Sequence, residues 1–93
     1  MYRHIVLFRV HDDIDNERVT EAIAALRSLA GLPGVESWNV ELSLDHRKGR
    51  VIVEDATFAS TEAFEAFRDS DRHRLAGRLM AETSDWWIGD YIT

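Results

Sequence analysis

The sequence predicts an α+β fold, and three observations support this prediction. Segments with the alternating apolar pattern of strands are interspersed with segments whose apolar residues recur every three or four positions, as in helices. Their order is strand, helix, strand, strand, split helix, strand. Two of the strands are apolar on both faces, which is typical of the middle of a sheet. The length of 93 residues fits a single domain, which we expect to span residues 1–93.

The first strand and the first helix are predicted over residues 1–10 and 17–30. The strand is apolar on both faces and should therefore be central in the sheet. Asp15 or Asn16 can accept hydrogen bonds from the free amides that begin the helix. The helix has one apolar stripe at spacings of four and three, formed by Val19, Ile23, Leu26 and Leu29.

The second and third strands are predicted over residues 35–44 and 50–58. Apolar and polar residues alternate in the second strand, so one of its faces should be wetted. The apolar face of this strand consists of Trp38, Val40, Leu42 and Leu44. The third strand contains the consecutive apolar residues Val51, Ile52 and Val53, which predict burial on both of its faces.

A split helix follows the third strand. Either Ser60 or Thr61 can cap its beginning, and an acidic residue follows in the first turn. We expect Phe64 and Phe67 to point inward from this helix. The Asp-Ser-Asp sequence at residues 69–71 should interrupt it.

The remaining chain predicts a third helix over residues 72–83 and a last strand over residues 85–92. The apolar residues of this helix are Leu75, Leu79 and Met80. Two β-α-β units related in this way form a ferredoxin-like protomer with a four-stranded antiparallel sheet. In such a sheet the first and third strands are central and the second and fourth are edges, which agrees with their apolar patterns.

The last strand is unusually aromatic for an edge. One face has Trp86, Ile88 and Ile92, and the other has Trp87 and Tyr91. Helices can cover only one face of the sheet, and each large apolar side chain left in water forgoes about 1.5–3 kcal/mol. An exposed apolar face also favours aggregation. The sequence therefore predicts a homodimer with two-fold symmetry, in which two sheets pair into a dimeric α/β barrel.

Composition excludes several classes of protein. The chain has 11 basic and 17 acidic residues, and the resulting formal charge of −6 argues against a nucleic-acid partner. It has no cysteine, which excludes disulfides and thiolate metal sites. No apolar stretch approaches the ~20 residues of a membrane span, so we expect no membrane partner and a soluble, cytoplasmic domain.

Two histidines are the candidate catalytic residues, and each has a structural alternative. A neutral His73 could take a proton from a carbon acid, or it could be a capping or surface residue. His4 shares a strand face with Val6 and Phe8, so it could polarise a carbonyl or could be a hydrogen-bonded core histidine.

Glu54 and Asp55 are adjacent acids on an otherwise apolar strand and should face opposite sides. A buried carboxylate needs a partner, for which Arg3, Arg9 and His4 are the candidates. A buried acid beside a histidine is the strongest sign of a site in this sequence, although an ion pair that joins the first and third strands would give the same pattern. Sequence alone leaves open which of the two acids faces the cavity.

The aromatic residues are candidates for a ligand pocket, although core or interface packing explains them equally well. The candidate substrate-binding residues are Phe8, Glu54, Phe64, Phe67 and Trp87. The four histidines include no ligand pair at the spacing of a zinc site, so we expect no metal. Nothing in the sequence indicates another cofactor.

Most of the chain resembles the stress-responsive α/β-barrel (Dabb) domain family. The resemblance is found in residues 3–9, 32–35, 56–58, 64–67, 71–73 and 85–91. It implies a dimeric α/β barrel built from two ferredoxin-like protomers. It also implies little about activity, since many members are known only as stress-associated proteins.

One plant member that the chain distantly resembles, olivetolic acid cyclase, closes a polyketide chain. The resemblance aligns its general base with His73 and its first-strand histidine with His4. This chain has Phe67 where the cyclase has a tyrosine, and Ile52 near the position of a third histidine.

Three functions are consistent with these observations. The first is binding of a small, aromatic or polyketide-like molecule in a cavity between helices and sheet. The second is a cofactor-independent enzyme of the cyclase, isomerase or monooxygenase type, with His73 as general base. The third is a purely structural or assembly role, in which aromatic side chains would fill the cavity.

Overall fold

A computed structural model describes all 93 residues of the chain. It contains five strands and three helices in the predicted order, with a short final strand added at the C-terminus. The elements are β1 (Tyr2–Val10), α1 (Asn16–Arg27), β2 (Val35–Leu42), β3 (Val51–Phe58), α2 (Thr61–Arg68), α3 (Asp71–Thr83), β4 (Ser84–Ile88) and β5 (Tyr91–Ile92).

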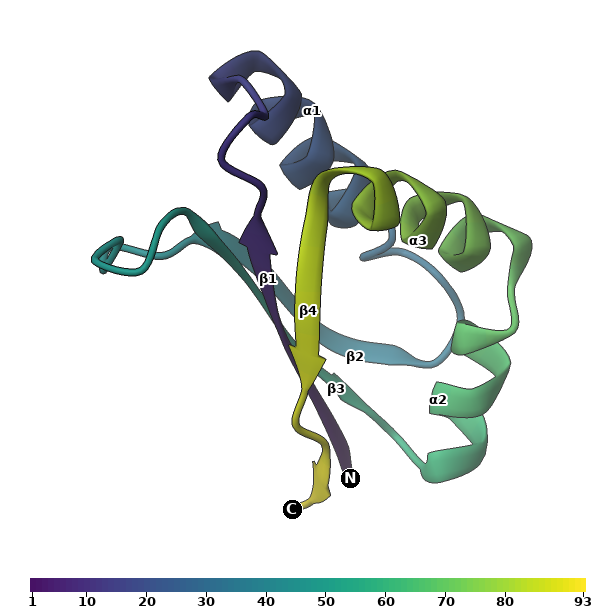
Figure 1. The fold of residues 1–93 in the computed structure, drawn as a ribbon. Coiled ribbons are helices and arrows are strands. Elements are labelled where there is room, and N and C mark those ends of the chain that lie inside the picture. Colours follow the sequence, from purple (N-terminus) through teal and green to yellow (C-terminus); the bar gives the residue numbers. More distant parts are fainter.

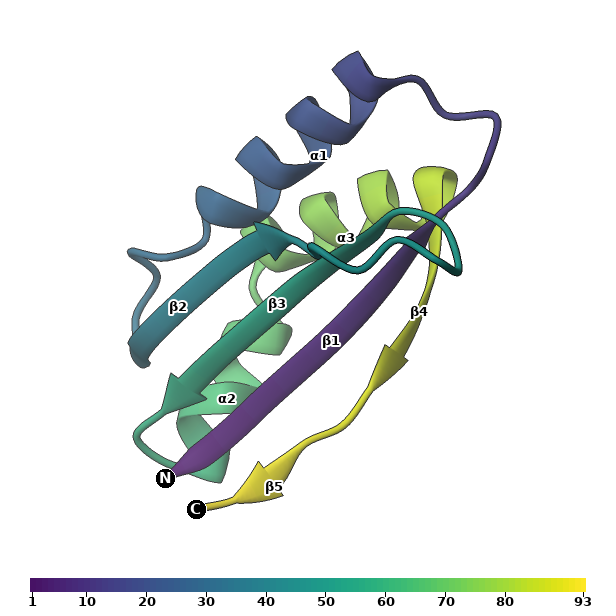
Figure 2. The same cartoon turned by 90° about the vertical axis from the view of Figure 1, so that its left-hand side faces the viewer.

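The sheet is antiparallel with the strand order β2-β3-β1-β4, and β5 also pairs with β1. All three helices lie on one face of it, so the molecule has two layers (Figure 1). Figure 2 shows the opposite, uncovered face of the sheet. The central positions of β1 and β3 and the edge positions of β2 and β4 confirm the predicted ferredoxin-like protomer.

The predicted last strand is broken at two residues. Val6 lies opposite Ile88, and Arg3 lies opposite Tyr91, so β4 and β5 keep one common register along β1. Gly89 and Asp90 belong to neither strand. The single strand expected over residues 85–92 is therefore two strands, because the side chain of Asp90 binds a backbone amide of β1 at the break.

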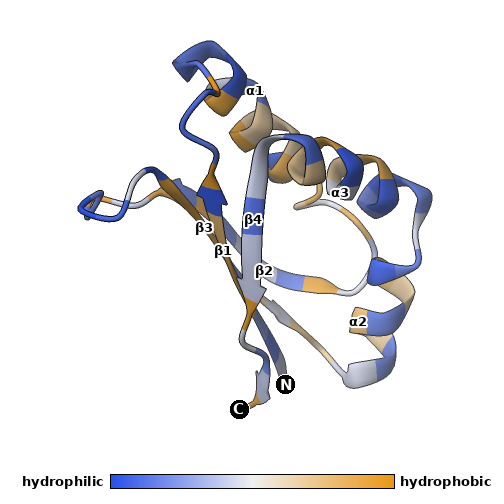
Figure 3. Cartoon of the chain, viewed as in Figure 1, coloured by the Kyte–Doolittle hydropathy of each residue, from blue (hydrophilic) through white to orange (hydrophobic).

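The core lies between the sheet and the helices. Along β3, alternate residues are buried on the helical side, namely Ile52, Glu54, Ala56 and Phe58. β1 and β3 carry hydrophobic colours in Figure 3, whereas the β2–β3 loop is hydrophilic. The predicted inward orientation of Phe64 and Phe67 on α2 is confirmed, since both are buried.

Side-chain caps begin each helix, as the sequence predicts for the first two. Asp15 accepts a hydrogen bond from the Arg18 amide at the start of α1. Ser60 accepts one from the Ala63 amide at the start of α2. Helix α1 ends at Arg27, three residues earlier than expected, and turns replace its last predicted residues.

Three apolar residues predicted to face the core are exposed, the first of them Leu42, which is 43% exposed at the end of β2. Leu44 lies beyond the end of β2 and is 98% exposed, because the strand ends at Leu42. Leu75 is 60% exposed, because α3 turns Ala76 and Met80 toward the sheet instead. None of the three helices combines the length and the apolar character needed to span a membrane.

The uncovered face of the sheet carries large apolar side chains. Leu7 on β1 and Trp87 on β4 are direct cross-strand neighbours on this face, and Trp87 is 65% exposed. Arg3 and Asp55 lie on the same face, where their side chains form an ion pair with a nitrogen–oxygen distance of 2.7 Å. The two chain ends also lie side by side, since the Thr93 amide donates a hydrogen bond to the Met1 carbonyl (Figures 1 and 2).

Candidate functional site

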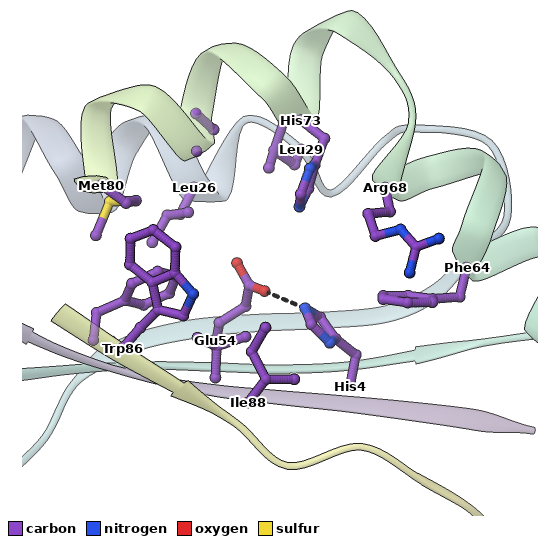
Figure 4. A pocket seen from close by; sticks show the side chains of 14 residues that line it. His4, Leu26, Leu29, Glu54, Phe64, Arg68, His73, Met80, Trp86 and Ile88 are labelled. Atoms are coloured by element: carbon purple, nitrogen blue, oxygen red, sulfur yellow. Dashed lines mark ion pairs between the residues drawn. The ribbon is translucent and has the colours of Figure 1, made fainter. Parts of the chain in front are cut away.

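A cavity of about 110 Å³ lies between the inner face of the sheet and helices α1 and α3. Its walls are mainly apolar, with Leu26 and Leu29 from α1, Met80 from α3, and Trp86 and Ile88 from β4 (Figure 4). Four polar side chains also line it: His4, Glu54, Arg68 and His73. An apolar cavity with a few convergent polar groups is the usual form of a small-molecule site.

His4 and Glu54 form a buried pair on the floor of the cavity. His4 Nε2 lies 3.1 Å from Glu54 Oε2, and both side chains are only 4% exposed. The pair arises from the alternation of β1 and β3, which turns both residues toward the helices. Figure 4 shows the second Glu54 oxygen directed up into the cavity. Of the two adjacent acids, Glu54 therefore faces the cavity, and Asp55 faces the other side.

Asp90 is the second carboxylate partner of His4, and the sequence reasoning missed it. Its Oδ1 lies 2.8 Å from His4 Nδ1 and accepts a hydrogen bond from the Ile5 amide at 3.2 Å. Its Oδ2 accepts a hydrogen bond from the Tyr2 hydroxyl at 2.6 Å. In the sequence, the only sign of this role is that Gly89 and Asp90 interrupt an otherwise aromatic strand. That sign does not identify a partner, because only the register of the strands places Asp90 opposite His4.

These contacts determine the charge of His4. Burial alone would lower the pKa of His4, but hydrogen bonds and attraction from Glu54 and Asp90 outweigh burial and raise it. An imidazole between two carboxylates donates from both nitrogens only when it is protonated. Burial and the hydrogen bond to Asp90 also raise the pKa of Tyr2 to about 12, so Tyr2 remains a donor.

His73 faces this charged pair from the opposite wall (Figure 4). It lies in the first turn of α3, where its amide donates to the capping Ser70 Oγ at 3.2 Å, and its ring packs against Phe67 with a centroid distance of 5.0 Å. Burial lowers the pKa of His73, and the positive charges of His4 and Arg68 act in the same direction against the negative charge of Glu54. The imidazole is therefore neutral near pH 7 and free to accept a proton.

Arg68 is a second cavity residue that sequence reasoning missed. It is the last residue of α2, and its guanidinium carbon lies 5.7 Å from the centroid of the Phe64 ring. The sequence contains ten arginines among many acids, so nothing local distinguished this one.

The structure brings most of the sequence-predicted site residues together. His4, Phe8, Glu54, Phe64 and His73 all line the cavity. Two others do not line it: Phe67 and Trp87. Phe67 is buried behind His73 among Trp38 and Phe58, because its helix position turns it into the core. Trp87 points to the uncovered face of the sheet, and its neighbour Trp86 lines the cavity instead.

The arrangement is suited to moving a proton. A neutral imidazole and a carboxylate face one another across a largely apolar space, where electrostatic interactions are stronger than in water. No group of three or more histidine, aspartate or glutamate side chains is positioned to hold a metal ion.

Several solved structures share this fold. A dimeric ferredoxin-like protein of unknown function from Thermobifida fusca superposes with a TM-score of 0.88 at 25% identity, over 99% of this chain and 90% of that one. The hydroxynitrile lyase from Passiflora edulis superposes with a TM-score of 0.85 at 20% identity, over 99% and 92% of the two chains. A dimeric ferredoxin-like protein from Jannaschia sp. superposes with a TM-score of 0.82 at 21% identity, over 99% and 98%.

The match of the sequence to a family model identifies the family of this chain. No curated protein matches the chain significantly. The model of the stress responsive A/B barrel domain matches residues 2–93, which is nearly the whole chain. The resemblance inferred from the sequence is therefore confirmed, and the chain belongs to the stress-responsive A/B barrel domain (Dabb) family.

Proposed function

We propose that the cavity binds a small, mainly apolar organic molecule and that His73 acts on it as a general base. One observation supports this proposal above all: the His73 ring faces the His4–Glu54–Asp90 group across a mainly apolar cavity. The lowered pKa of His73, caused chiefly by burial, favours its neutral form. A purely structural role would not need such a space, since aromatic side chains would fill it.

The size of the cavity limits the ligand. An apolar cavity of about 150 Å³ takes up benzene, so a cavity of about 110 Å³ limits the enclosed part of the ligand to one ring at most. Trp86 and Ile88 line the cavity and are partly exposed, so a substituent can extend past them toward solvent.

The residues have distinct roles in this proposal. His73 removes a proton from a carbon next to a carbonyl group of the ligand, and the electron pair of the broken C–H bond moves toward the carbonyl oxygen to give an enolate. The imidazolium that forms is stabilised by the Glu54 carboxylate. His4 does not polarise the carbonyl, because both of its ring nitrogens contact carboxylates. It is a positioning residue, whose contact with Glu54 Oε2 keeps the other carboxylate oxygen oriented toward the cavity. The hydroxynitrile lyase with this fold supports the view that the fold can host chemistry on small molecules.

The test is deuterium exchange of phenylacetone, whose methylene protons are next to a carbonyl group. We expect the protein to accelerate exchange in D₂O, with the rate followed by proton NMR. The His73→Gln variant should lose about 10²-fold or more of the acceleration, the usual contribution of a general base. The His46→Gln variant is the matched control, because His46 is exposed in the β2–β3 loop, and it should behave as the unaltered protein does.

Two results would contradict the proposal in different ways. Equal acceleration by the His73→Gln variant would exclude His73 as the base. If phenylacetone shifted none of the amide resonances of cavity residues in a nitrogen–proton NMR titration, ligand binding itself would be excluded.

We also propose that two chains pair through the uncovered face of the sheet. The exposed cross-strand pair of Leu7 and Trp87 lies on this face, and the related proteins from Thermobifida fusca and Jannaschia sp. are described as dimeric. Packing this face against a second copy would remove these side chains from water and would complete an α/β barrel.

A further inference from the structure

Arg68 has donor groups that the protein does not use. Its Nε lies 3.8 Å from Asp69 Oδ1 in a loose ion pair, and the guanidinium donates no hydrogen bond. The side chain is 54% exposed, yet it lines the cavity and lies against the Phe64 ring. A planar guanidinium with free nitrogens is suited to binding a carboxylate through two parallel hydrogen bonds.

The cavity is chemically polarised along its length. Figure 4 shows Arg68 and Phe64 at one end and the apolar side chains of Trp86 and Met80 at the other. His73, Glu54 and His4 lie between these ends. A ligand with an apolar ring and an acidic group would therefore place the ring toward Trp86 and the acid toward Arg68.

The other charges near the cavity exclude the alternative orientations of such a ligand. The positive charge of His4 is matched by Glu54 and Asp90, which leaves no net attraction for an anion on the floor. The second Glu54 oxygen repels a carboxylate placed beside it. The chain as a whole has a formal charge of −6, so an anionic ligand needs a local cation. Arg68 is the cation with unused donors at this cavity.

We propose that Arg68 is a specificity-determining residue, which selects small aromatic carboxylates and holds their carboxylate at the α2 end of the cavity. The proposal rests on the proposed function, since it assumes that the cavity binds a small organic molecule. It adds the class of ligand and the direction in which the ligand lies.

Phenylacetate and phenylacetamide form a matched pair of probes, because they have the same shape and differ in charge. Their dissociation constants can be measured by NMR titration of the labelled full-length protein. The Arg68→Gln variant should weaken phenylacetate binding by about three- to tenfold, as expected for a partly exposed charged hydrogen bond. Its affinity for phenylacetamide should stay within about twofold of the unaltered protein, which also verifies that the variant is folded.

Two further variants separate a local contact from a general effect of charge. Arg78 is exposed on α3 and does not line the cavity, so the Arg78→Gln variant should bind both probes as the unaltered protein does. The Arg68→Lys variant keeps the charge and should restore part of the preference for phenylacetate.

The outcomes distinguish this inference from the proposed function. If both probes bind and the Arg68→Gln variant weakens neither, or weakens both equally, the role of Arg68 is overturned while the binding function stands. Equal weakening of phenylacetate by the Arg68→Gln and Arg78→Gln variants would also overturn it. If neither probe nor phenylacetone binds to the unaltered protein, the proposed function fails, and this inference fails with it.

Discussion

Replacing Asp90 by asparagine should destabilise the protein, and the loss should depend on pH. The substitution keeps the shape of the side chain but removes the charge that faces His4. The Asp90 carboxylate accepts hydrogen bonds from the Tyr2 hydroxyl and the Ile5 amide and contacts His4 Nδ1 at 2.8 Å. Its side chain is 16% exposed, so water replaces little of what is lost.

The size of the effect follows from these contacts. A hydrogen bond to a charged group contributes about 1.5–3 kcal/mol, and a neutral one about 0.5–1.5 kcal/mol. Asparagine retains an acceptor oxygen for part of the network. We therefore expect a loss of about 2–3 kcal/mol in the free energy of unfolding when His4 is protonated, below about pH 6.5.

The pH dependence has a definite sign. Because the pKa of His4 is raised in the folded state, its stabilisation is fully present below the unfolded pKa of about 6.5. It is lost as the pH rises through the folded pKa, by at most about 1.4 kcal/mol per pH unit. The Asp90→Asn variant has less of this stabilisation to lose. The difference in unfolding free energy between it and the unaltered protein should therefore shrink as the pH rises. His73 has the opposite dependence, because its pKa is lowered chiefly by burial. Burial of His73 is the same in both proteins, so the main part of its contribution drops out of the difference.

Urea denaturation followed by tryptophan fluorescence, between about pH 5.5 and pH 9, measures this difference. The protein concentration must be held constant, because the stability of a dimer depends on it. The Asp13→Asn variant is the control, since Asp13 is exposed in the loop before α1. A difference between the Asp90→Asn and unaltered proteins that stayed constant over this range would refute the reasoning, as would the absence of any difference.

Three further predictions concern the core, the sheet face and a helix cap. The Ile52→Ala variant should lose about 2–5 kcal/mol of unfolding free energy in urea denaturation, because Ile52 is completely buried. In the Leu44→Ala control, which alters an exposed residue, the free energy of unfolding should change by less than about 0.5 kcal/mol. Equal losses in the two variants would contradict the burial of Ile52 in the core. The Trp87→Glu variant should be a monomer in sedimentation velocity, because it places a charge beside Leu7 on the uncovered face; a dimer of unchanged strength would place the interface elsewhere. The Ser60→Ala variant should lose about 1 kcal/mol of unfolding free energy, because the Ala63 amide loses its hydrogen-bond acceptor. An unchanged urea midpoint would show that this helix cap contributes nothing to stability.

The strands, the helices and their order could be predicted from the sequence. Apolar spacing and capping residues act over a few positions, so they are visible without knowledge of the rest of the chain. The same local rules explain the errors in boundaries. The alternation of β2 continues to Leu44, but the strand ends at Leu42, and a hydrogen bond from the Ser43 amide to the Val51 carbonyl is its last backbone contact with β3.

Part of the site also followed from local rules. Alternation places His4 with Phe8 on one face of β1 and separates Glu54 from Asp55 on β3, as the structure confirms. Alternation also divides Trp86 from Trp87, but it does not say which of the two faces the helices. That choice belongs to the register and to the position of α3, so Trp86 and not Trp87 lines the cavity.

By itself, the sequence determined the α+β fold and the central position of β1 and β3, and it predicted that one acid of the third strand would be buried with His4, Arg3 or Arg9 as its partner. Only the tertiary structure decided that Asp90 meets His4 and that Arg68 lies at one end of the cavity. The physical reason is the distance along the chain: Asp90 is 86 residues from His4, and their contact exists only because β5 continues the register of β4 along β1. A pairing of this kind is set by packing of the whole sheet, whereas the pattern of each strand is set by its own residues.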